Sequence, residues 1–198
     1  MMFFDIETTS LNPYSDESKI ILAQIRRNGV THLFKEWELG EKQVINILLN
    51  EFCKLEKYEP VITYNGSFDF HFIMGRINEL GYDIYQKETM HHIFTTIKHC
   101  DLLQFDNGYF VSLEKICNQY NIPVTYKAYG KHMKKLYEKM EWEKILLHGE
   151  EDLILLEELI EKTDIYHRYD RIITISDEVR GFPLKYEVVK KDITYGVK

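Results

Sequence analysis

Cysteine, proline and long apolar runs are scarce in this chain of 198 residues, which contains three cysteines and four prolines. Cys53, Cys100 and Cys117 are odd in number and lack the spacing of a common metal site, so we interpret them as reduced thiols of a cytoplasmic protein. No run approaches the roughly 20 apolar residues that span a bilayer, and no charged-then-apolar leader precedes Phe3. We therefore expect neither a membrane segment nor a signal peptide.

Two acids alternate with apolar residues near the start of the chain, in the run Phe3-Phe4-Asp5-Ile6-Glu7. This alternation predicts a β-strand that carries Asp5 and Glu7 on one face and turns Ile6 into the core. Two carboxylates so close repel each other, and burial would raise the pKa of one unless a cation lies between them. A divalent metal is the economical interpretation, although a surface strand also explains the pair on its own.

A further acid, Asp69, follows a second strand-like run at residues 61–64 and the turn signal Asn65-Gly66. Helical spacing continues from there until Gly81. Asp69 is therefore expected in the first turn of a helix, where the macrodipole favours a carboxylate. Helix stabilisation alone would also explain an acid at this position.

His148 and Asp152 lie on one side of a third predicted element, a long amphipathic helix over residues 142–166. At about 100° per residue, the two side chains are separated by roughly 40° around the axis. They share that side with the apolar residues Leu155, Leu156 and Leu159. Ionisable groups on an apolar stripe need partners or a metal, whereas Glu150 and Glu151 fit a solvated acidic cluster.

The remaining pattern predicts one α/β domain, for which the chain is long enough. The predicted strands cover residues 2–6, 19–27, 30–37, 61–64 and 97–102, and the predicted helices cover residues 41–57, 68–80, 113–120, 129–140 and 142–166. Asn28-Gly29 predicts a hairpin between the second and third strands. An antiparallel meander followed by strand–helix alternation favours a mixed β-sheet flanked by helices. We expect residues 1–170 to form this domain and residues 171–198 to be a C-terminal extension of unknown role.

Together, the three acidic segments resemble the DEDD superfamily of 3′–5′ exonucleases, which have a ribonuclease-H-like fold. Residues 4–8 match its first motif, residues 65–69 match the second, and His148 with Asp152 matches the third. The wording of residues 64–70 is similar to the proofreading domains of family-B DNA polymerases and their stand-alone relatives. The resemblance covers residues 2–165 and implies the same fold for this chain.

The third motif departs from the best-known patterns, which have Tyr with three residues before Asp, or His with four. Three residues separate His148 from Asp152, and this combination is similar to the YprB-type ribonuclease-H-like branch. One residue of register rotates a helical side chain by about 100°. His148 therefore stands where the tyrosine subgroup has its Tyr.

The resemblance implies a metal-dependent 3′–5′ exonuclease that hydrolyses phosphodiester bonds, with single-stranded DNA as the expected substrate. Two divalent cations are implied, Mg²⁺ or Mn²⁺, because the ligands are oxygens. Asp5, Glu7 and Asp152 would hold the first cation. Asp5 would also contact the second, with Asp69 supporting it directly or through water. His148 would orient or deprotonate the attacking water.

Contacts to nucleic acid are expected from the motifs and from a basic cluster between residues 126 and 140: Thr8, Asn65, Phe68, Lys131, Lys134 and Lys135. A solvated helix face explains the three lysines equally well. The formal net charge of −7 opposes phosphate binding. Two bound divalent cations would cancel the charge of the site carboxylates locally.

Two alternatives are compatible with the same motifs. An RNA exonuclease or a structure-selective nuclease would use the same carboxylates, and no residue that reads the 2′-hydroxyl is identifiable from the sequence. A non-catalytic nucleic-acid-binding subunit would keep the fold without the chemistry. The intact set of Asp5, Glu7, Asp69 and Asp152 argues against that subunit, which would have no need of four converging acids.

Overall fold

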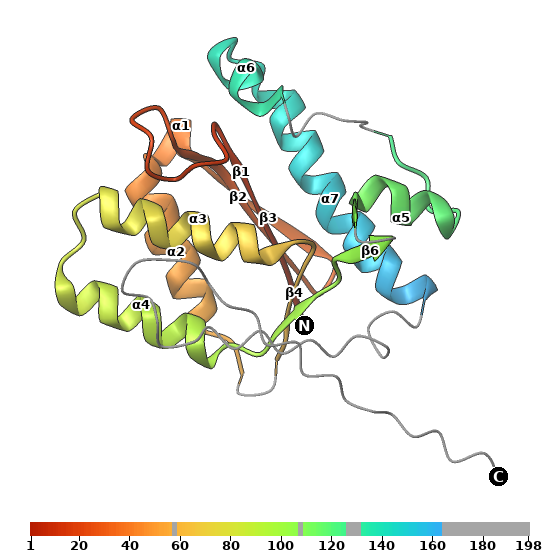
Figure 1. Ribbon diagram of the computed structural model, residues 1–198, viewed down its shortest axis with the longest axis horizontal. Helices are drawn as coiled ribbons and strands as arrows, with labels where there is room; N and C mark the ends of the chain where they lie inside the picture. The colour runs from red at the N-terminus through yellow and green to blue at the C-terminus, as the bar shows by residue number, and fades with distance from the viewer. Residues whose placement is uncertain (57–58, 107–108, 126–131, 164–198) are drawn as a thin grey trace.

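A five-stranded mixed sheet with the order β3-β2-β1-β4-β5 forms the centre of the computed structural model (Figure 1). The structure describes residues 1–56, 59–106, 109–125 and 132–163. The strands of this sheet are β1 Met2–Thr8, β2 Ile20–Arg27, β3 Val30–Lys35, β4 Val61–Thr63 and β5 His99–Asp101. Strands β1 to β3 are antiparallel, whereas β4 and β5 run parallel to β1. The predicted extension at residues 171–198 and Lys131 lie outside the described residues.

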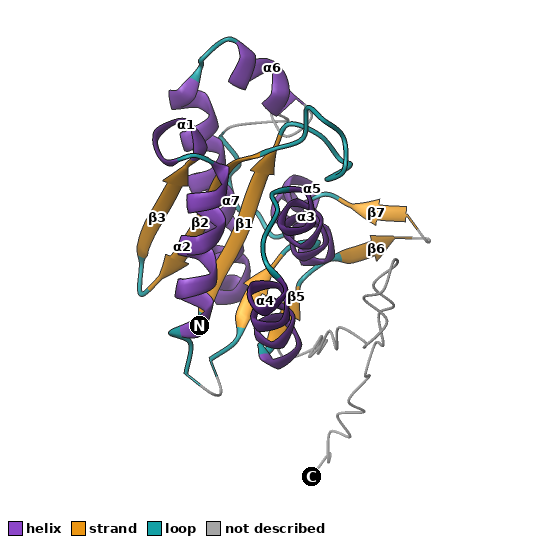
Figure 2. Ribbon diagram, turned by 90° about the vertical axis from the view of Figure 1, so that its left-hand side faces the viewer, coloured by secondary structure: helices purple, strands orange, loops and turns teal. Residues whose placement is uncertain are grey.

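Helices cover both faces of this sheet (Figure 1). The helices are α1 Glu36–Leu39, α2 Glu41–Cys53, α3 Gly66–Glu79, α4 Ile84–Thr96, α5 Leu113–Gln119, α6 Met133–Glu138 and α7 Trp142–Lys162. A separate hairpin of β6 Gln104–Asp106 and β7 Tyr109–Val111 lies beside α3 and α5 (Figure 2). The predicted mixed sheet flanked by helices is thus confirmed. No helix in the described ranges has the length and apolar character needed to cross a membrane.

The alternation along β1 separates the two halves of the core. Met2, Phe4 and Ile6 pack in one apolar cluster with residues of α2, α3 and α4. Phe3 points the other way and packs in a second cluster with residues of α5 and α7. Asp5 and Glu7 continue the row of Phe3, because side chains two residues apart share a face. The two acids therefore face α7, as the alternation predicts.

Several predicted boundaries are wrong. The third strand ends at Lys35, and Trp37 lies in α1, where its ring stacks on Trp142 with centroids 4.5 Å apart. Helix α4 and the β6–β7 hairpin were not predicted at all. Helix α4 exposes Ile84 and Tyr85, which weakens the apolar periodicity on which the prediction rests. Its start does carry a capping box, in which the side chains and backbone amides of Asp83 and Gln86 bond reciprocally, and this pattern is readable from sequence.

Candidate active site

The site forms where β1 and β4 diverge. The parallel ladder between them contains only the pairs Met2↔Val61 and Phe3↔Ile62. Further along β1, the Ile6 amide donates to Asp69 Oδ1 at 3.2 Å. A carboxylate from the first turn of α3 thus replaces a strand partner. This bond brings the acid of the second motif next to the two acids of β1.

The turn before α3 is held by a fifth carboxylate, Asp101, at the end of β5. Asp101 Oδ1 accepts hydrogen bonds from the backbone amide of Asn65 at 2.8 Å and from the backbone amide of Leu103 at 3.0 Å. Asn65 has a φ of 65°, which Asn tolerates better than most residues. Gly66 is required next to it, because a β-carbon there would lie 2.2 Å from Thr63 Oγ1. The turn is therefore built to aim the first turn of α3 at β1.

Helix α7 packs on the face of β1 that carries Asp5 and Glu7, and it contributes His148 and Asp152 to the site. His148 Nε2 lies 3.6 Å from Glu7 Oε1 and 3.6 Å from Asp152 Oδ2. Glu7, His148 and Asp152 each offer one ligand atom within 4.8 Å of the others. The helical phase predicted from the sequence is confirmed. The three motifs of the resemblance converge in space.

Asp5 is held by Gln24, its partner in the antiparallel register of β1 and β2. The fully buried Gln24 donates from Nε2 to Asp5 Oδ2. Its other amide atom, Oε1, faces Gly149 and has no hydrogen-bond partner among the described residues. Through Nε2, the Gln24 amide fixes one oxygen of Asp5.

Burial and mutual repulsion raise the pKa of every acid in the cluster. Burial raises the pKa of Asp5 from 3.8 to about 7, and the charge of Asp152 adds to the effect. Burial also raises the pKa of Asp152 to about 7. The pKa values of Glu7 and Asp69 are raised well above their ordinary range by burial and by the charge of Asp5. Burial lowers the pKa of His148, so the imidazole is neutral at physiological pH.

This donor set fits a divalent cation. Carboxylate oxygens are the ligands that hard cations such as Mg²⁺ and Mn²⁺ prefer, and one imidazole is compatible with Mn²⁺. Burial and the neighbouring carboxylates both disfavour the charged form of these acids, which raises their pKa values. A divalent cation would supply positive charge and would favour the deprotonated acids. Within the described part of the chain, Glu7, His148 and Asp152 form a group of three ligand residues that could hold such an ion.

All five groups line one cleft of about 380 Å³, together with Thr8, Asn65 and Phe68 of the predicted nucleic-acid contacts. The Asp152 side chain is 27% exposed, so solvent reaches the acids. The two predicted lysines that the structure describes, Lys134 and Lys135, lie elsewhere. Lys134 forms an ion pair with Glu17, and Lys135 is exposed on α6. Neither lysine is among the described residues that line the cleft.

Three positioning residues and one aromatic residue of the cleft lining were not predicted from the sequence motifs. Gln24 is polar within the otherwise apolar run Ile20–Ile25, which is a signal that could have been used. Asp101 lies in the predicted strand 97–102 and Gly149 directly follows His148, but neither carries a signal of its own. Phe110, on β7, also lines the cleft and comes from an element that was not predicted.

Comparisons with known proteins agree with this geometry. The family model RNase_H_2, described as "RNase_H superfamily", matches residues 2–164. Among curated proteins, no sequence matches this chain. In structure the chain is similar to a family B DNA polymerase from the hyperthermophilic archaeon Pyrobaculum calidifontis, with a TM-score of 0.64 and 13% identity over 81% of this chain and 24% of the polymerase. The chain thus spans about a quarter of the polymerase, and at this identity the likeness shows the fold alone. Because the family match covers the sheet, its helices and all three acidic motifs, this chain belongs to the RNase H superfamily.

Proposed function

We propose that this protein is a metal-dependent 3′–5′ exonuclease that hydrolyses phosphodiester bonds of single-stranded DNA. The observation that carries the proposal is the convergence of four carboxylates, from β1, α3 and α7, with an imidazole in one cleft. Members of the RNase H superfamily are typically phosphodiester hydrolases that use divalent metals, which agrees with this donor set. The polarity and the choice of DNA come from the resemblance of the motifs, and the assay below tests both.

Asp5, Glu7, Asp69 and Asp152 would hold the cations. Bound divalent cations supply positive charge to the phosphate and lower the pKa of the attacking water. Gln24 donates to Oδ2 of Asp5 and so helps to set the orientation of that carboxylate. The bond from the Ile6 amide does the same for Asp69. The protein therefore presents carboxylates whose orientation is set before substrate arrives.

His148 would accept the proton of the attacking water. Its pKa is lowered by burial, so the imidazole is available as a base near neutral pH. Its Nε2 lies 3.6 Å from Glu7 Oε1 and 3.6 Å from Asp152 Oδ2, a distance that supports a role as base beside the acids proposed to bind metal. A base in this position is within reach of a water held by the same acids.

A labelled-substrate assay tests the proposal. Single-stranded DNA and RNA labelled at the 5′ end would be incubated with Mg²⁺, Mn²⁺ or EDTA, beside circular single-stranded DNA. Stepwise shortening of the linear DNA from the 3′ end, lost in EDTA, supports the exonuclease. Asp5→Asn should be inactive. Asp16→Asn, at an exposed acid of the following loop, is the matched control and should be active.

Each of the other possible results of this assay would support a different function. Shortening of RNA but not of DNA would make the protein an RNA exonuclease. Cleavage of the circular strand would show an endonuclease, because a circle has no 3′ end. Binding of either strand without cleavage, in both Mg²⁺ and Mn²⁺, would support the non-catalytic subunit and overturn the proposal.

A further inference from the structure

The cleft is lined by two kinds of side chain. One kind is the acids and His148, and the other is apolar or aromatic and includes Tyr64, Phe68, Phe110, Leu113 and Leu155. The cleft volume of about 380 Å³ lies in the range of about 300–1,000 Å³ that is usual for small-ligand sites. Hydrolysis at the acids requires only that the phosphate reach them. The apolar part of the lining is therefore free to contact the sugar and base of the nucleotide.

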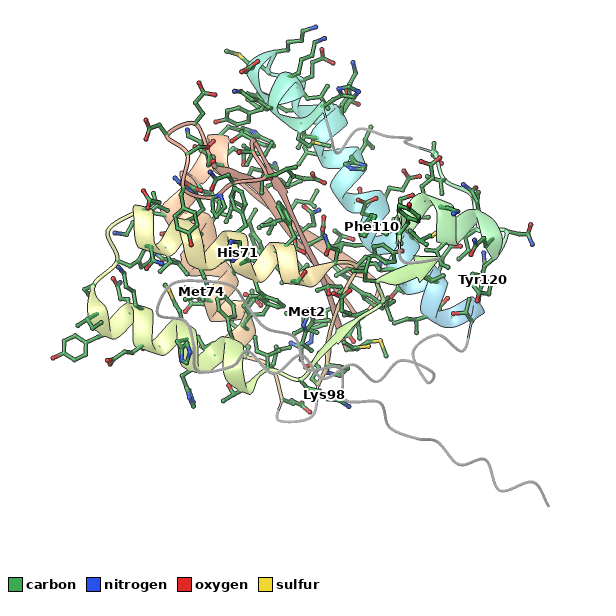
Figure 3. All side chains as sticks on the ribbon, viewed as in Figure 1. Met2, His71, Met74, Lys98, Phe110 and Tyr120 are labelled. Carbon is green, nitrogen blue, oxygen red and sulfur yellow. The ribbon has the colours of Figure 1, made fainter. Side chains whose placement is uncertain are left out.

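Phe110 is a partly exposed member of this apolar lining. It leaves 53% of its surface accessible to solvent while lining the cleft. Phe110, labelled in Figure 3, lies on β7 in the hairpin beside α3 and α5 (Figure 2). The Phe110 ring is thus both accessible to solvent and part of the lining of the cleft that holds the acids.

Tyr64 contacts strand β7 of the hairpin in two ways. Its hydroxyl donates to the Val111 carbonyl, and its ring meets the Phe110 ring edge-to-face with centroids 6.2 Å apart. Such aromatic pairs add stability beyond the area that they bury. Because Tyr64 immediately precedes Asn65 and the second motif, the position of Phe110 is tied to the turn that aims Asp69.

Tyr109, the preceding residue of β7, provides an internal comparison. Successive side chains of a strand point to opposite faces. Tyr109 is 79% exposed, and it is not among the described residues that line the cleft. The two neighbouring rings therefore differ in one respect that matters here, namely whether they face the acids.

The charge balance makes a non-ionic contact valuable. The chain has a formal net charge of −7, and Lys134 of the basic cluster is already paired with Glu17. Phosphate attraction alone would then give weak binding. Stacking of a base on an aromatic ring needs no positive charge, tolerates any base, and contributes about fivefold to 100-fold in affinity for each base.

We propose that Phe110, braced by Tyr64, stacks on the unpaired base at the 3′ end of the substrate while the adjoining phosphate lies at the acids. The proposal rests on the proposed function and narrows its substrate to strands whose 3′-terminal base is unpaired. A paired base is stacked on its neighbour in the duplex and must leave that stack to reach Phe110. Blunt duplex ends should therefore be poorer substrates than single strands.

Binding without hydrolysis tests the proposal. In an Asp5→Asn background with Mg²⁺, the affinity for 5′-labelled single-stranded DNA would be measured by fluorescence anisotropy. Phe110→Ala should weaken binding by about fivefold to 100-fold, whereas Phe110→Trp should restore it. Tyr109→Ala is the matched control on the other face of the strand and should bind normally. Thermal melting of each variant checks that the fold is intact.

A substrate change isolates the stacking contact. A strand with an abasic 3′-terminal sugar should bind the parent protein as weakly as the ordinary strand binds Phe110→Ala. Phe110→Ala should then cause no further loss with the abasic strand. An equal loss with both strands would overturn the proposal, because Phe110 would not act through the base.

The failure of this inference is distinguishable from failure of the proposed function. If the wild-type protein shortens DNA and Phe110→Ala binds and shortens it equally well, the stacking role is wrong and the exonuclease stands. If the wild-type protein neither binds nor shortens DNA or RNA, both are wrong.

Discussion

Gly149 lies so close to Gln24 that a β-carbon at residue 149 would come within 2.7 Å of Gln24 Oε1. The glycine directly follows His148 in α7, and the glutamine amide donates to Asp5 on the neighbouring strand. Because Gly149 has no side chain, Gln24 on β2 has room to adopt the position from which it donates to Asp5. This contact links the third motif to the first.

Gly149→Ala should reduce metal affinity by about 10- to 100-fold, as is usual when a partner of a metal ligand is displaced. The added methyl group displaces Gln24 and removes its bond to Asp5. Overpacking should cost about 1–3 kcal/mol of stability, offset by about 1 kcal/mol of helix propensity. Mn²⁺ titration followed by electron paramagnetic resonance measures the affinity, and thermal melting measures the stability.

A double variant separates the clash from the lost hydrogen bond. Gly149→Ala combined with Gln24→Ala should recover stability, because the clash is gone. It should not recover metal affinity, because Asp5 still lacks its donor. Recovery of both would show that Gln24 does not position Asp5.

Asp152→Asn should abolish hydrolysis while leaving the fold intact. In EDTA at about pH 8 the variant should melt at a temperature equal to or above that of the parent, because one of four repelling carboxylates becomes neutral. Circular dichroism and a nuclease assay measure the two effects together. Turnover near the parental rate by a well-folded variant would contradict the metal-binding role of Asp152.

Stability in EDTA should fall as pH rises from about 5 to about 8. Asp5 and Asp152 titrate near 7 in the folded protein, whereas an aspartate in an unfolded chain titrates near about 3.9. Between these values the folded state binds more protons, so the free energy of unfolding decreases with rising pH. Adding Mg²⁺ should raise the melting temperature more at the higher pH, because the cation binds the deprotonated acids.

The control for this pH dependence is the double variant Asp5→Asn with Asp152→Asn. Its melting temperature in EDTA should vary less with pH than that of the parent. A parental melting temperature that rises with pH in EDTA would contradict the raised pKa values.

His148→Ala should lower turnover by about 10² to 10⁴ if the imidazole is the base, with little change in metal affinity, since carboxylates bind hard cations. The pH–rate profile should lose its acid limb, which burial places below the usual histidine pKa of 6.5. His148→Tyr should retain more activity than Ala, because the spacing is that of the tyrosine subgroup. Equal activity of the two variants would make that analogy wrong.

Replacing Lys131, Lys134 and Lys135 by Gln should weaken DNA binding and flatten its salt dependence by up to about 0.7 log unit per phosphate contact. Lys134→Gln alone provides the comparison, since Lys134 already pairs with Glu17. An unchanged slope for the triple variant would leave these lysines as a solvated face of the protein.

Local periodicity was enough to predict much of the site. The alternation in β1 placed Asp5 and Glu7 on one face, and helical phase placed His148 beside Asp152. The Asn28-Gly29 hairpin was also predicted, and both residues have the positive φ that such a tight turn requires. These features depend on residues within a few positions of one another, so the sequence contains the whole signal.

The non-local features were beyond that signal. The residue patterns of β1 and β4 do not predict that their pairing ends at Phe3. Nor do they predict that the Ile6 amide donates to Asp69. The hairpin that carries Phe110 has strands of only three residues, too short for alternation to be read with confidence from sequence. Its placement depends on the contact with Tyr64, which lies far away in the chain.

The sequence by itself therefore determined the types of residue, their faces and the order of the three motifs. Only the tertiary structure decided which groups hold the acids in place, through strand register and through close packing at Gly66 and Gly149. The physical reason is that register and packing satisfy many distant residues at once. A periodic pattern constrains one element, whereas the orientation of Asp5 depends on Gln24 in the next strand and on Gly149 in a helix packed across both.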